Sequence, residues 1–570
     1  MSVEEAIPES RPGRATRRRY RGLVGNVKME DYSLRYAPTK YRRWSEYAVA
    51  TTALGGIAYL ADYAIGASIA VAHGFSSALW AILLAATVIF LTGIPIAYYA
   101  ARYSIDMDLL TRGAGFGYLG STITSLIYAS FTFIFFSLEG SIMAQALQMS
   151  LGVPLPIGYL IVSLIVIPLV MYGMTALSKL QMWTQPLWLL LMVAPLVAVV
   201  GTHPGILGAW THFGGSSKSG PGFNFLAMGL GAGVALSLIA QIGEQVDYLR
   251  FMPPKTEKNS GRWWLAVLGA GPGWVLLGLL KQLSGAFLAF YVASSVGLTK
   301  AVEPIEQLLG GFRSFMPAGA LAAATIFVVL SQVKINVTNA YSGSLSWSNF
   351  FSRVLHWHPG RVVWIFFNVG IALGLMEGGV FGVLNFVLGF YSNVAIAWIG
   401  AVVADLVINK PILKISPPYI EFKRAHLYAV NPVGFGSMLL ASAVSVAAFF
   451  GVFGPDVAAF SPFVAFAIAF VASPLIALAT KGKYYLARED LLSAAVDQHH
   501  DDDAPTPAEL EFGCRVCEES YELVDIVACP FHNGAVCSLC CTLEKACHDQ
   551  CKQPGSIIPT AVQLKITGAS

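Results

Sequence analysis

Charged residues are scarce in this sequence. They make up 12% of the chain, whereas a soluble domain carries about 25%. The mean hydropathy is +0.62, and apolar runs of about 20 residues, the length that spans a bilayer as a helix, recur from Tyr47 to Thr480. The scarcity of charge therefore excludes a soluble main body and predicts an all-α membrane protein.

Cysteine is absent from the whole apolar region. All eight cysteines lie between Cys514 and Cys551, so no disulfide can form between the membrane spans. The first 45 residues lack an apolar stretch, and we therefore expect no cleavable signal peptide. A nucleophile elbow, a P-loop and a membrane metal motif are also lacking, so we do not expect an enzyme.

The apolar runs predict about twelve membrane spans. Several contain glycine and proline, which membrane helices tolerate where neighbouring helices satisfy the freed backbone groups. The predicted spans are 47–72, 77–103, 119–149, 156–174, 184–200, 224–244, 263–292, 317–345, 362–381, 383–408, 433–453 and 459–480.

Lysine and arginine gather on alternate sides of these spans. The first 45 residues and the loops after the sixth, eighth and tenth spans are rich in them, with Arg17, Lys258 and Lys423 as examples. The positive-inside rule places such segments in the cytoplasm. We predict a multi-pass protein of the bacterial inner (plasma) membrane with both termini cytoplasmic. The arginine run is interpreted as an orientation signal and lipid anchor, not as a nucleic-acid-binding segment.

Changes in composition divide the chain into five predicted parts. A basic N-terminal segment (1–45) precedes the membrane domain (46–482). A polar linker (483–512), a cysteine-rich module (513–553) and a short tail (554–570) follow. The low hydrophobicity of the linker predicts a flexible connection between the two larger parts.

Several ionisable residues fall within the predicted spans. A charge at the bilayer centre costs at least about 2.5–3.5 kcal/mol, so each must face the interior of the bundle. These residues are Asp62, Glu139, Glu244, Lys281, Lys334, Glu377 and Asp405. Asp62, Glu139 and Lys334 lie deepest, and we expect them either to form a buried ion pair or to line a functional site.

The eighth span carries two polar stripes. Helical spacing puts the first stripe on one face, and it consists of Ser331, Lys334, Thr338 and Tyr341. The second stripe lies on an adjacent face and consists of Gln332, Asn336 and Asn339. Hydrogen bonds between helices explain one stripe. A hydrated site explains both.

Glycines interrupt the first and sixth spans. Gly55 and Gly56 precede Asp62 in the first span, and glycines recur from Gly229 to Gly233 in the sixth. Interrupted helices at matching positions in two halves point to the binding site of an inverted-repeat transporter. Close packing of helices is the other interpretation of the same glycines.

With these features in place, the sequence resembles the nucleobase–cation symporter-1 family of purine, cytosine, allantoin and hydantoin permeases. The stretch 112–120 is similar to that family's Arg-Ala-x-Phe-Gly-x-x-Gly loop, and 247–251 is similar to its Asp-Phe-Thr-Arg-Tyr motif. The stretch 331–339 resembles its eighth span, and Asp405 resembles the acidic residue that ends its tenth. The resemblance covers roughly residues 45–480.

The resemblance implies a LeuT-like 5+5 inverted repeat with two added helices, and a substrate between spans 1, 3, 6 and 8. Phe135 and Glu139 stand where the hydantoin transporter of the family has an aromatic residue and a glutamine. The family's tryptophan of span 6 has no counterpart here. We expect the substrate-binding residues to be Asp62, Phe135, Glu139, Gln241, Gln332 and Asn336.

The sodium site of the family is altered in this sequence. Lys334 and Ile335 stand where the family has a serine and a threonine. At about 4 Å an ammonium opposes Na⁺ by on the order of 4 kcal/mol at an effective dielectric of about 20. We predict transport that is independent of sodium, and either coupled to protons through Lys334 or uncoupled. The predicted ion-coupling residues are Lys334, Thr338 and Asp62, with Asp62 and Glu139 as counter-ions of Lys334.

The cysteine spacing predicts a metal-binding module. Two Cys-x2-Cys pairs and four further cysteines suit structural zinc, with one or two ions held by Cys514, Cys517, Cys529, Cys537, Cys540, Cys541, Cys547 and Cys551. Reduced free thiols and an iron–sulfur cluster are the alternatives, and His532 and His548 are candidate substitutes for a thiolate. The module also resembles one found in transporter-like bacterial sensors.

Two functions follow from these observations. The first is a secondary active transporter of a small nitrogenous solute, such as a nucleobase, in the lipid bilayer. The second is a transporter-like sensor or scaffold that signals through its zinc module to a separate cytoplasmic protein. The permease-like spans favour the first function, and the cysteine module favours the second.

Overall fold

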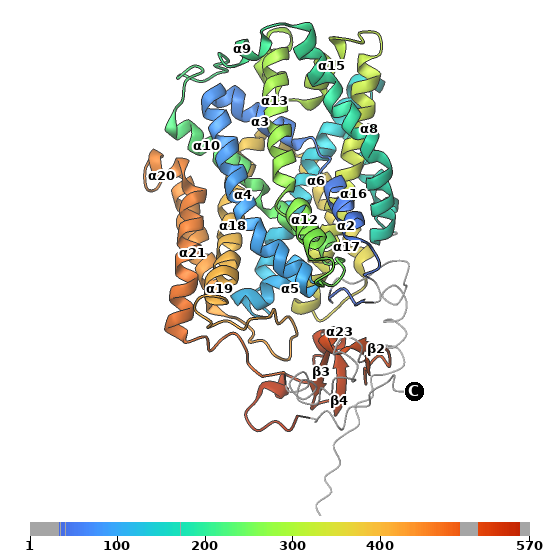
Figure 1. Ribbon diagram of the computed structural model, residues 1–570, viewed down its shortest axis with the longest axis vertical. Helices are drawn as coiled ribbons and strands as arrows, with labels where there is room; N and C mark the ends of the chain where they lie inside the picture. The colour runs from blue at the N-terminus through green and yellow to red at the C-terminus, as the bar shows by residue number, and fades with distance from the viewer. Residues whose placement is uncertain (1–33, 35, 40–41, 172, 491–510, 559–570) are drawn as a thin grey trace, which may run out of the picture.

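Two parts make up the structure. The computed structural model describes residues 34, 36–39, 42–171, 173–490 and 511–558. A bundle of long helices forms the larger part, and a small module of strands and one short helix lies against one end of it (Figure 1). The arginine run around Arg17 and most of the predicted linker and tail lie outside the described residues.

The first half of the bundle begins with a helix whose N-cap, Ser45, accepts a hydrogen bond from the backbone N–H of Ala48. Its helices are α2 Glu46–Gly56, α3 Ala61–His73, α4 Phe75–Tyr103, α5 Met107–Thr111, α6 Thr122–Leu151, α7 Leu155–Met171, α8 Gly173–Thr202, α9 Ile206–Trp210, α10 Phe225–Ala235, η4 Leu236–Ala240 and α11 Gln241–Leu249.

The second half contains the longest helix, α16 Ala320–Val354. The other helices are α12 Ser260–Ala270, α13 Trp274–Val296, α14 Leu298–Ala301, α15 Pro304–Arg313, α17 Arg361–Glu377, α18 Leu384–Ala404, α19 Pro432–Phe449, α20 Pro455–Ala459 and α21 Ser461–Thr480. Asn431 caps α19 and is followed by Pro432, whose missing N–H is not needed in the first turn.

Nine helices in the described part of the chain are long and apolar enough to cross a membrane, and ten if α2 and α3 form one bent span. The apolar helix α7 is shorter, with 17 residues. The multi-pass architecture predicted from the apolar runs is confirmed, whereas the count of about twelve spans stays a prediction.

The first and sixth spans are both interrupted. The first bends by 49° between α2 and α3, where residues 57–60 leave the helix. The sixth passes from α10 through the 3-10 turn η4 into α11. These interruptions follow the glycines of both spans, as the sequence indicated, although the glycines themselves make close helix contacts.

Close packing explains two of those glycines. A Cβ added to Gly55 would lie 2.7 Å from Cβ of Gln181 on α8, and one added to Gly231 would lie 2.7 Å from Cγ2 of Ile69 on α3. Distances below 3.0 Å require a neighbour to shift. The glycines therefore let α2 approach α8 and let α10 approach α3.

The cysteine module consists of two antiparallel strand pairs and a short helix. Strand β1 (Glu511–Gly513) pairs with β2 (Ser520–Glu522), and β3 (Ile526–Cys529) pairs with β4 (Gly534–Cys537). The helix α23 (Ser538–Leu543) follows β4 directly. The small core of the module also takes in Leu34 and Ala425 from outside it.

Hydrogen bonds hold the module against the bundle. Nη1 of Arg424 donates to the carbonyl oxygens of Cys541 and Glu544, at 2.9 and 2.5 Å. Nδ1 of His356, just after α16, lies 2.9 Å from the carbonyl oxygen of Thr542, and the N–H of Thr39 donates to Glu522. The start of the described chain and the module therefore lie at the same end of the bundle.

Candidate functional site

The break in the first span is held by a carboxylate from α6. The N–H groups of Leu60 and Ala61 donate to Glu139, with N–O distances of 3.0 to 3.3 Å. These donors begin α3, where the helix dipole is positive and its first N–H groups have no partner within the helix. Glu139 therefore supplies the N-terminal cap that the sequence of α3 itself lacks.

The same carboxylate joins the break to α16. Nε2 of Gln332 donates to Oε2 of Glu139 at 2.5 Å, and both side chains are fully buried. Gln332 thus connects the polar helix α16 with the start of α3 through a single side chain of α6. The structure brings together Glu139 and Gln332, two of the residues predicted to bind substrate.

Lys281 of α13 reaches into the break. Its Nζ lies 2.6 Å from the carbonyl oxygen of Ile57, 3.1 Å from that of Tyr59 and 2.9 Å from Oδ2 of Asp62. Gln282 donates to the other Asp62 oxygen at 2.8 Å. Asp62 therefore belongs to a buried ion pair with Lys281, a residue to which the sequence assigned no role.

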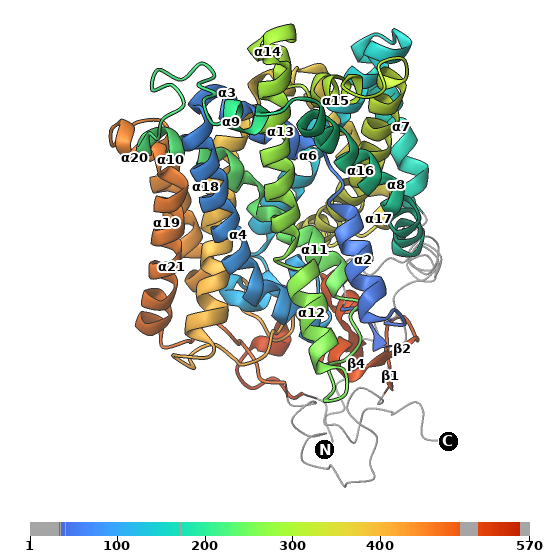
Figure 2. The same ribbon diagram turned by 45° about the horizontal axis from the view of Figure 1, so that its top comes forward.

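Close contact between α3 and α13 fixes this geometry (Figure 2). A Cβ on Gly66 would lie 1.9 Å from the carbonyl oxygen of Gln282, and a Cβ on Gly285 would lie 2.2 Å from that of Tyr63. Only glycine allows so close an approach of two backbones. The two helices are thus held with Lys281 opposite the break.

One face of α16 carries buried polar atoms that lack partners among the described residues. These atoms are Oε1 of Gln332, Nδ2 of Asn336 and Oδ1 of Asn339. All three side chains are fully buried, and Nδ2 of Asn339 donates to Oδ1 of Asn336 at 3.2 Å. A buried polar group without a partner costs about 1–3 kcal/mol, so this face has both donors and acceptors available for a polar ligand.

Lys334 and Thr338 lie on another side of α16, against α8. Nζ of Lys334 lies 2.7 Å from Oε1 of Gln185 and 3.3 Å from the carbonyl oxygen of Gln181. Nε2 of Gln181 donates to the carbonyl oxygen of Lys334 at 2.9 Å and lies 3.4 Å from Oγ1 of Thr338. The predicted ion-coupling residues therefore fall into two groups, with Asp62 at the break and the other two beside α8. The prediction that Asp62 and Glu139 are counter-ions of Lys334 is wrong, because Asp62 pairs with Lys281 and Glu139 contacts the start of α3 and Gln332.

The remaining predicted residues occupy separate positions. Gln241, at the start of α11, donates to Glu244 at 2.7 Å. Phe135 lies one helical turn from Glu139 on α6, and its ring packs on that of Phe131 with centroids 4.5 Å apart. Gln181 was missed from the sequence because the predicted spans 156–174 and 184–200 left it between them, whereas α8 runs through it. Lys281 was visible as a charge within a span, but its partners lie more than 200 positions away.

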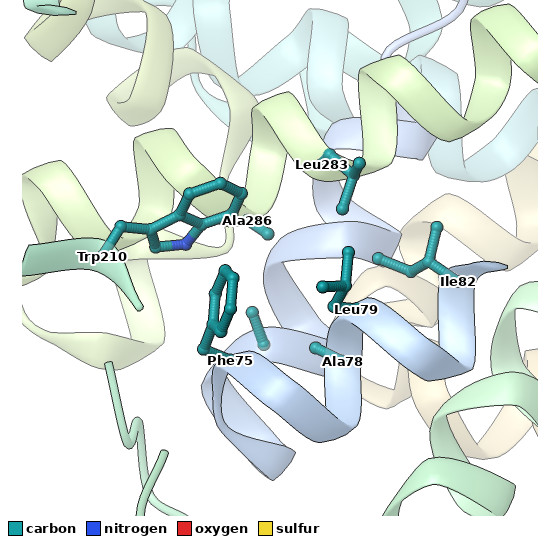
Figure 3. A pocket seen from close by; sticks show the side chains of 8 residues that line it. Phe75, Ala78, Leu79, Ile82, Trp210, Leu283 and Ala286 are labelled. Carbon is teal, nitrogen blue, oxygen red and sulfur yellow. The ribbon is translucent and has the colours of Figure 1, made fainter. Parts of the chain in front are cut away.

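A small apolar pocket lies away from these polar residues. Figure 3 shows Phe75, Leu79 and Trp210 around it, and Ala70, Ala78, Ile82, Leu283 and Ala286 complete the lining. Its volume of about 10 Å³ accommodates about one water molecule. The pocket is therefore too small and too apolar to be the site of a polar solute.

Four cysteines of the module form a cluster. The sulfurs of Cys514, Cys517, Cys537 and Cys540 all lie within 4.8 Å of one another. Tetrahedral zinc, with Zn–S bonds of about 2.3 Å, needs sulfurs about 3.8 Å apart. Hydrogen bonds from the thiols of Cys514, Cys537 and Cys540 lower the pKa of Cys517. The cluster is compatible with a metal site.

The other four cysteines are arranged more loosely. Cys529, Cys541, Cys547 and Cys551 line one cleft of the module together with Asp549. Within the described residues they do not form a cluster as tight as the first. Burial raises the pKa of Cys529 to about 11, so this thiol is protonated at neutral pH unless an ion binds it.

Comparisons with known proteins give a fold but no family. No family model matches the chain, and no curated protein matches it. Among solved structures, Mhp1, a nucleobase-cation-symport-1 family transporter in a closed conformation with bromovinylhydantoin bound, superposes with a TM-score of 0.58 at 18% identity. The match covers 80% of this chain and 99% of Mhp1.

Two further structures agree. Inward-facing Mhp1 gives a TM-score of 0.54 at 19% identity, over 80% of this chain and 97% of that chain. A Na⁺-coupled sialic acid symporter gives 0.50 at 13% identity, over 82% and 95%. The chain therefore has the fold of the LeuT-type secondary transporters, as its resemblance implied, and these neighbours are transporters rather than enzymes.

Proposed function

We propose that this protein is a secondary active transporter of a small nitrogenous solute, such as a nucleobase or a related compound. The observation that carries the proposal is the face of α16 with unpartnered atoms on Gln332, Asn336 and Asn339. A solute that offers both N–H donors and carbonyl acceptors would satisfy these atoms together. Asp62, Phe135, Glu139 and Gln241 remain the other proposed substrate-binding residues.

A binding screen tests this site. Purines, pyrimidines, hydantoins and amino acids are added to the purified protein, and the shift in thermal unfolding is measured. We expect one nitrogenous class to stabilise the wild type and Gln307→Leu, which removes a buried glutamine of α15 outside the site. Gln332→Leu should weaken that binding at least about 10-fold, the effect of losing about 1.4 kcal/mol. Equal loss of binding in Gln332→Leu and Gln307→Leu would show that the solute does not bind at this face of α16.

We propose that transport does not require sodium. Lys334 stands where the related symporters have a sodium-ligating hydroxyl, and its ammonium contacts Oε1 of Gln185 and the carbonyl oxygen of Gln181. A positive charge at that position opposes the binding of Na⁺ there. Proton coupling through Lys334, with Thr338 and Asp62, stays part of the proposal. Its test is binding and uptake with sodium replaced by choline at constant ionic strength.

We propose structural zinc in the cysteine module, with Cys514, Cys517, Cys537 and Cys540 as the ligands of one ion. A second ion would use Cys529, Cys541, Cys547 and Cys551, which line one cleft. Zinc would join chain segments that share only short strands and a small core. Elemental analysis of the full chain distinguishes one zinc from two, and bound iron would indicate an iron–sulfur cluster instead.

A specific contact favours a second function, that of a transporter-like sensor. The module binds the end of α16 through His356 and the loop after α18 through Arg424. Because α16 also carries Gln332 and Asn336, a movement of this helix on solute binding would reach the module directly. A sensor would bind solute without flux and would need a cytoplasmic signalling partner.

We propose that both termini are cytoplasmic, because the segments rich in lysine and arginine lie on their side of the membrane. With both termini cytoplasmic in a bacterial inner membrane, the module lies in the reducing compartment, where free thiols and zinc sites persist. A reporter fused after Ser570 should be active only in the cytoplasm. Periplasmic activity of that fusion would reverse the assignment.

A further inference from the structure

The break between α2 and α3 has the oxygen atoms of a cation site. The carbonyl oxygens of Ile57 and Tyr59 and the carboxylate of Asp62 all point at one position, which Nζ of Lys281 occupies. An ammonium has three N–H donors, and here each has an oxygen partner. The ring of Tyr59 covers the same ammonium, with its centroid 3.5 Å from Nζ.

Such a set of ligands does not require an ammonium. Unwound backbone carbonyls near the middle of a membrane bind sodium in transporters with broken helices, and hard monovalent cations prefer oxygen ligands of the kind collected here. The carboxylate supplies one negative charge, which a bound monovalent cation would balance. We propose that the break is a monovalent-cation site that the chain fills with its own ammonium, and that removal of the Lys281 side chain opens it to a cation from solution.

The ammonium of Lys334 has different surroundings from that of Lys281. Its ammonium lies beside a neutral amide oxygen, one carbonyl oxygen and the ring of Trp188, and no carboxylate contacts it among the described residues. Gln185, which provides the amide oxygen, is only part-buried. Removing Lys334 therefore leaves no unbalanced charge and no closed set of oxygen ligands.

The surroundings keep the oxygen ligands in place when the ammonium is removed. Glu139 holds the N–H groups of Leu60 and Ala61, and Gln282 holds the second oxygen of Asp62. Neither the contacts of Glu139 nor the hydrogen bond from Gln282 to Asp62 involves the Lys281 side chain. The close contact of α3 with α13 at Gly66 and Gly285 also remains in a Lys281 variant.

The experiment measures cation binding, so its outcome does not depend on whether the protein transports. Wild type, Lys281→Ala and the matched control Lys334→Ala are purified in NaCl, choline chloride and ethylammonium chloride at equal ionic strength. Thermal unfolding is then followed as a function of each salt. We expect Na⁺ or ethylammonium to raise the midpoint of Lys281→Ala saturably by at least about 3 °C over choline. Wild type and Lys334→Ala should not respond.

A further variant removes the proposed charge of the site. Adding Asp62→Asn to Lys281→Ala should abolish the response, because no carboxylate remains to bind the cation. If Lys281→Ala is recovered as folded protein only in Na⁺ or ethylammonium, the same dependence is shown more strongly. The inference is overturned if folded Lys281→Ala ignores all three cations or if Lys334→Ala responds equally. Failure to recover Lys281→Ala in every salt, while Asp62→Asn/Lys281→Gln folds, also overturns it.

A sodium response of the wild type has a separate meaning. It would contradict the proposed sodium independence of transport, since Lys281 occupies the break in that protein. The cation site proposed at the break would still be tested by the difference between Lys281→Ala and the wild type in how the unfolding midpoint responds to each salt. The two proposals can therefore fail independently.

Discussion

The break in the first span and the cysteine cluster of the module both bring together oxygen or sulfur atoms that can bind a cation. They differ in where that cation comes from. At the break, two carbonyls and Asp62 surround an ammonium that belongs to the chain. In the module, the sulfurs of Cys514, Cys517, Cys537 and Cys540 all lie within 4.8 Å of one another. An ammonium on the chain cannot dissociate, so the membrane domain keeps its charge balance where an unpaired carboxylate is costly. By our proposal, the module takes its cation from solution.

This difference leads us to expect that the fold of the module, but not that of the membrane domain, depends on a bound metal ion. The membrane domain carries the counter-ion of Asp62 in its sequence, and its large core includes both halves of the broken span. The module has a small core and two short strand pairs. We therefore expect removal of metal to affect the module alone, and removal of lysine to affect the membrane domain alone.

The largest expected effect is loss of the module fold without metal. Structural zinc contributes roughly 10–16 kcal/mol in small fingers, so Cys537→Ser or chelation should unfold residues 511–558. Hydrogen exchange of the full chain should show lost protection there and unchanged protection in α3 and α13. A module that stays protected with no bound metal would contradict this dependence. Cys551→Ser, in the looser cysteine group, should remove at most one of two ions.

The next effect concerns the ion pair at the break. Lys281→Met leaves Asp62 buried without its partner, and breaking a buried pair costs about 3–5 kcal/mol. The double variant Asp62→Asn/Lys281→Met should recover most of this loss, because no charge is then left unpaired. Thermal unfolding in choline buffer gives the comparison. Equal instability of the single and double variants would show that packing, not charge, holds the break.

A smaller effect is expected at Glu139. Glu139→Gln keeps the shape but replaces one acceptor oxygen by an N–H₂ group, which cannot accept from Leu60 or Ala61. The loss should be about 1–3 kcal/mol of stability and, by our proposal, weaker binding of a solute rich in N–H donors. Calorimetric titration with the solute found in the screen measures the second quantity. Unchanged affinity for the solute would show that Glu139 caps α3 and does not contribute to solute binding.

The smallest effect on stability is expected at Lys334. Its partner Gln185 is part-buried, so water can replace the ammonium, and Lys334→Ala should cost about 0.5–1.5 kcal/mol. If Lys334 carries protons, the variant should nevertheless alter the dependence of uptake on pH. A pH profile identical to that of the wild type would leave Lys334 as a packing residue.

The sequence was sufficient for the multi-pass helical architecture and for the position of the breaks, because apolar runs and the glycines around Gly56 are local signals. The LeuT-type fold was implied by the family resemblance, and the count of about twelve spans stays a prediction. The partners of Lys281 and the role of Gln181 could not be predicted, because both depend on contacts between spans far apart in the chain. The docking of the module on Arg424 and His356 is likewise a long-range contact of polar residues that any cytoplasmic loop could contain.

Glu139 makes contacts in the structure that its match to the related permeases did not predict. The sequence placed it beside the substrate because it matches a substrate-binding glutamine of the related permeases. In the structure its oxygens accept from the start of α3 and from Gln332. Within the described residues, the α16 side chains Gln332, Asn336 and Asn339 carry buried atoms without partners, and these residues form one of the two polar stripes that the sequence proposes as a hydrated site.

The most direct test of the account is solute uptake into proteoliposomes. The purified full chain is reconstituted, a labelled solute from the stabilising nitrogenous class is added outside, and accumulation is followed over time with sodium or with choline. We expect saturable accumulation that is the same in both salts and is reduced at least about 10-fold by Gln332→Leu. Binding of the same solute with no accumulation would contradict transport and identify a sensor, and accumulation that requires sodium would contradict the proposed coupling.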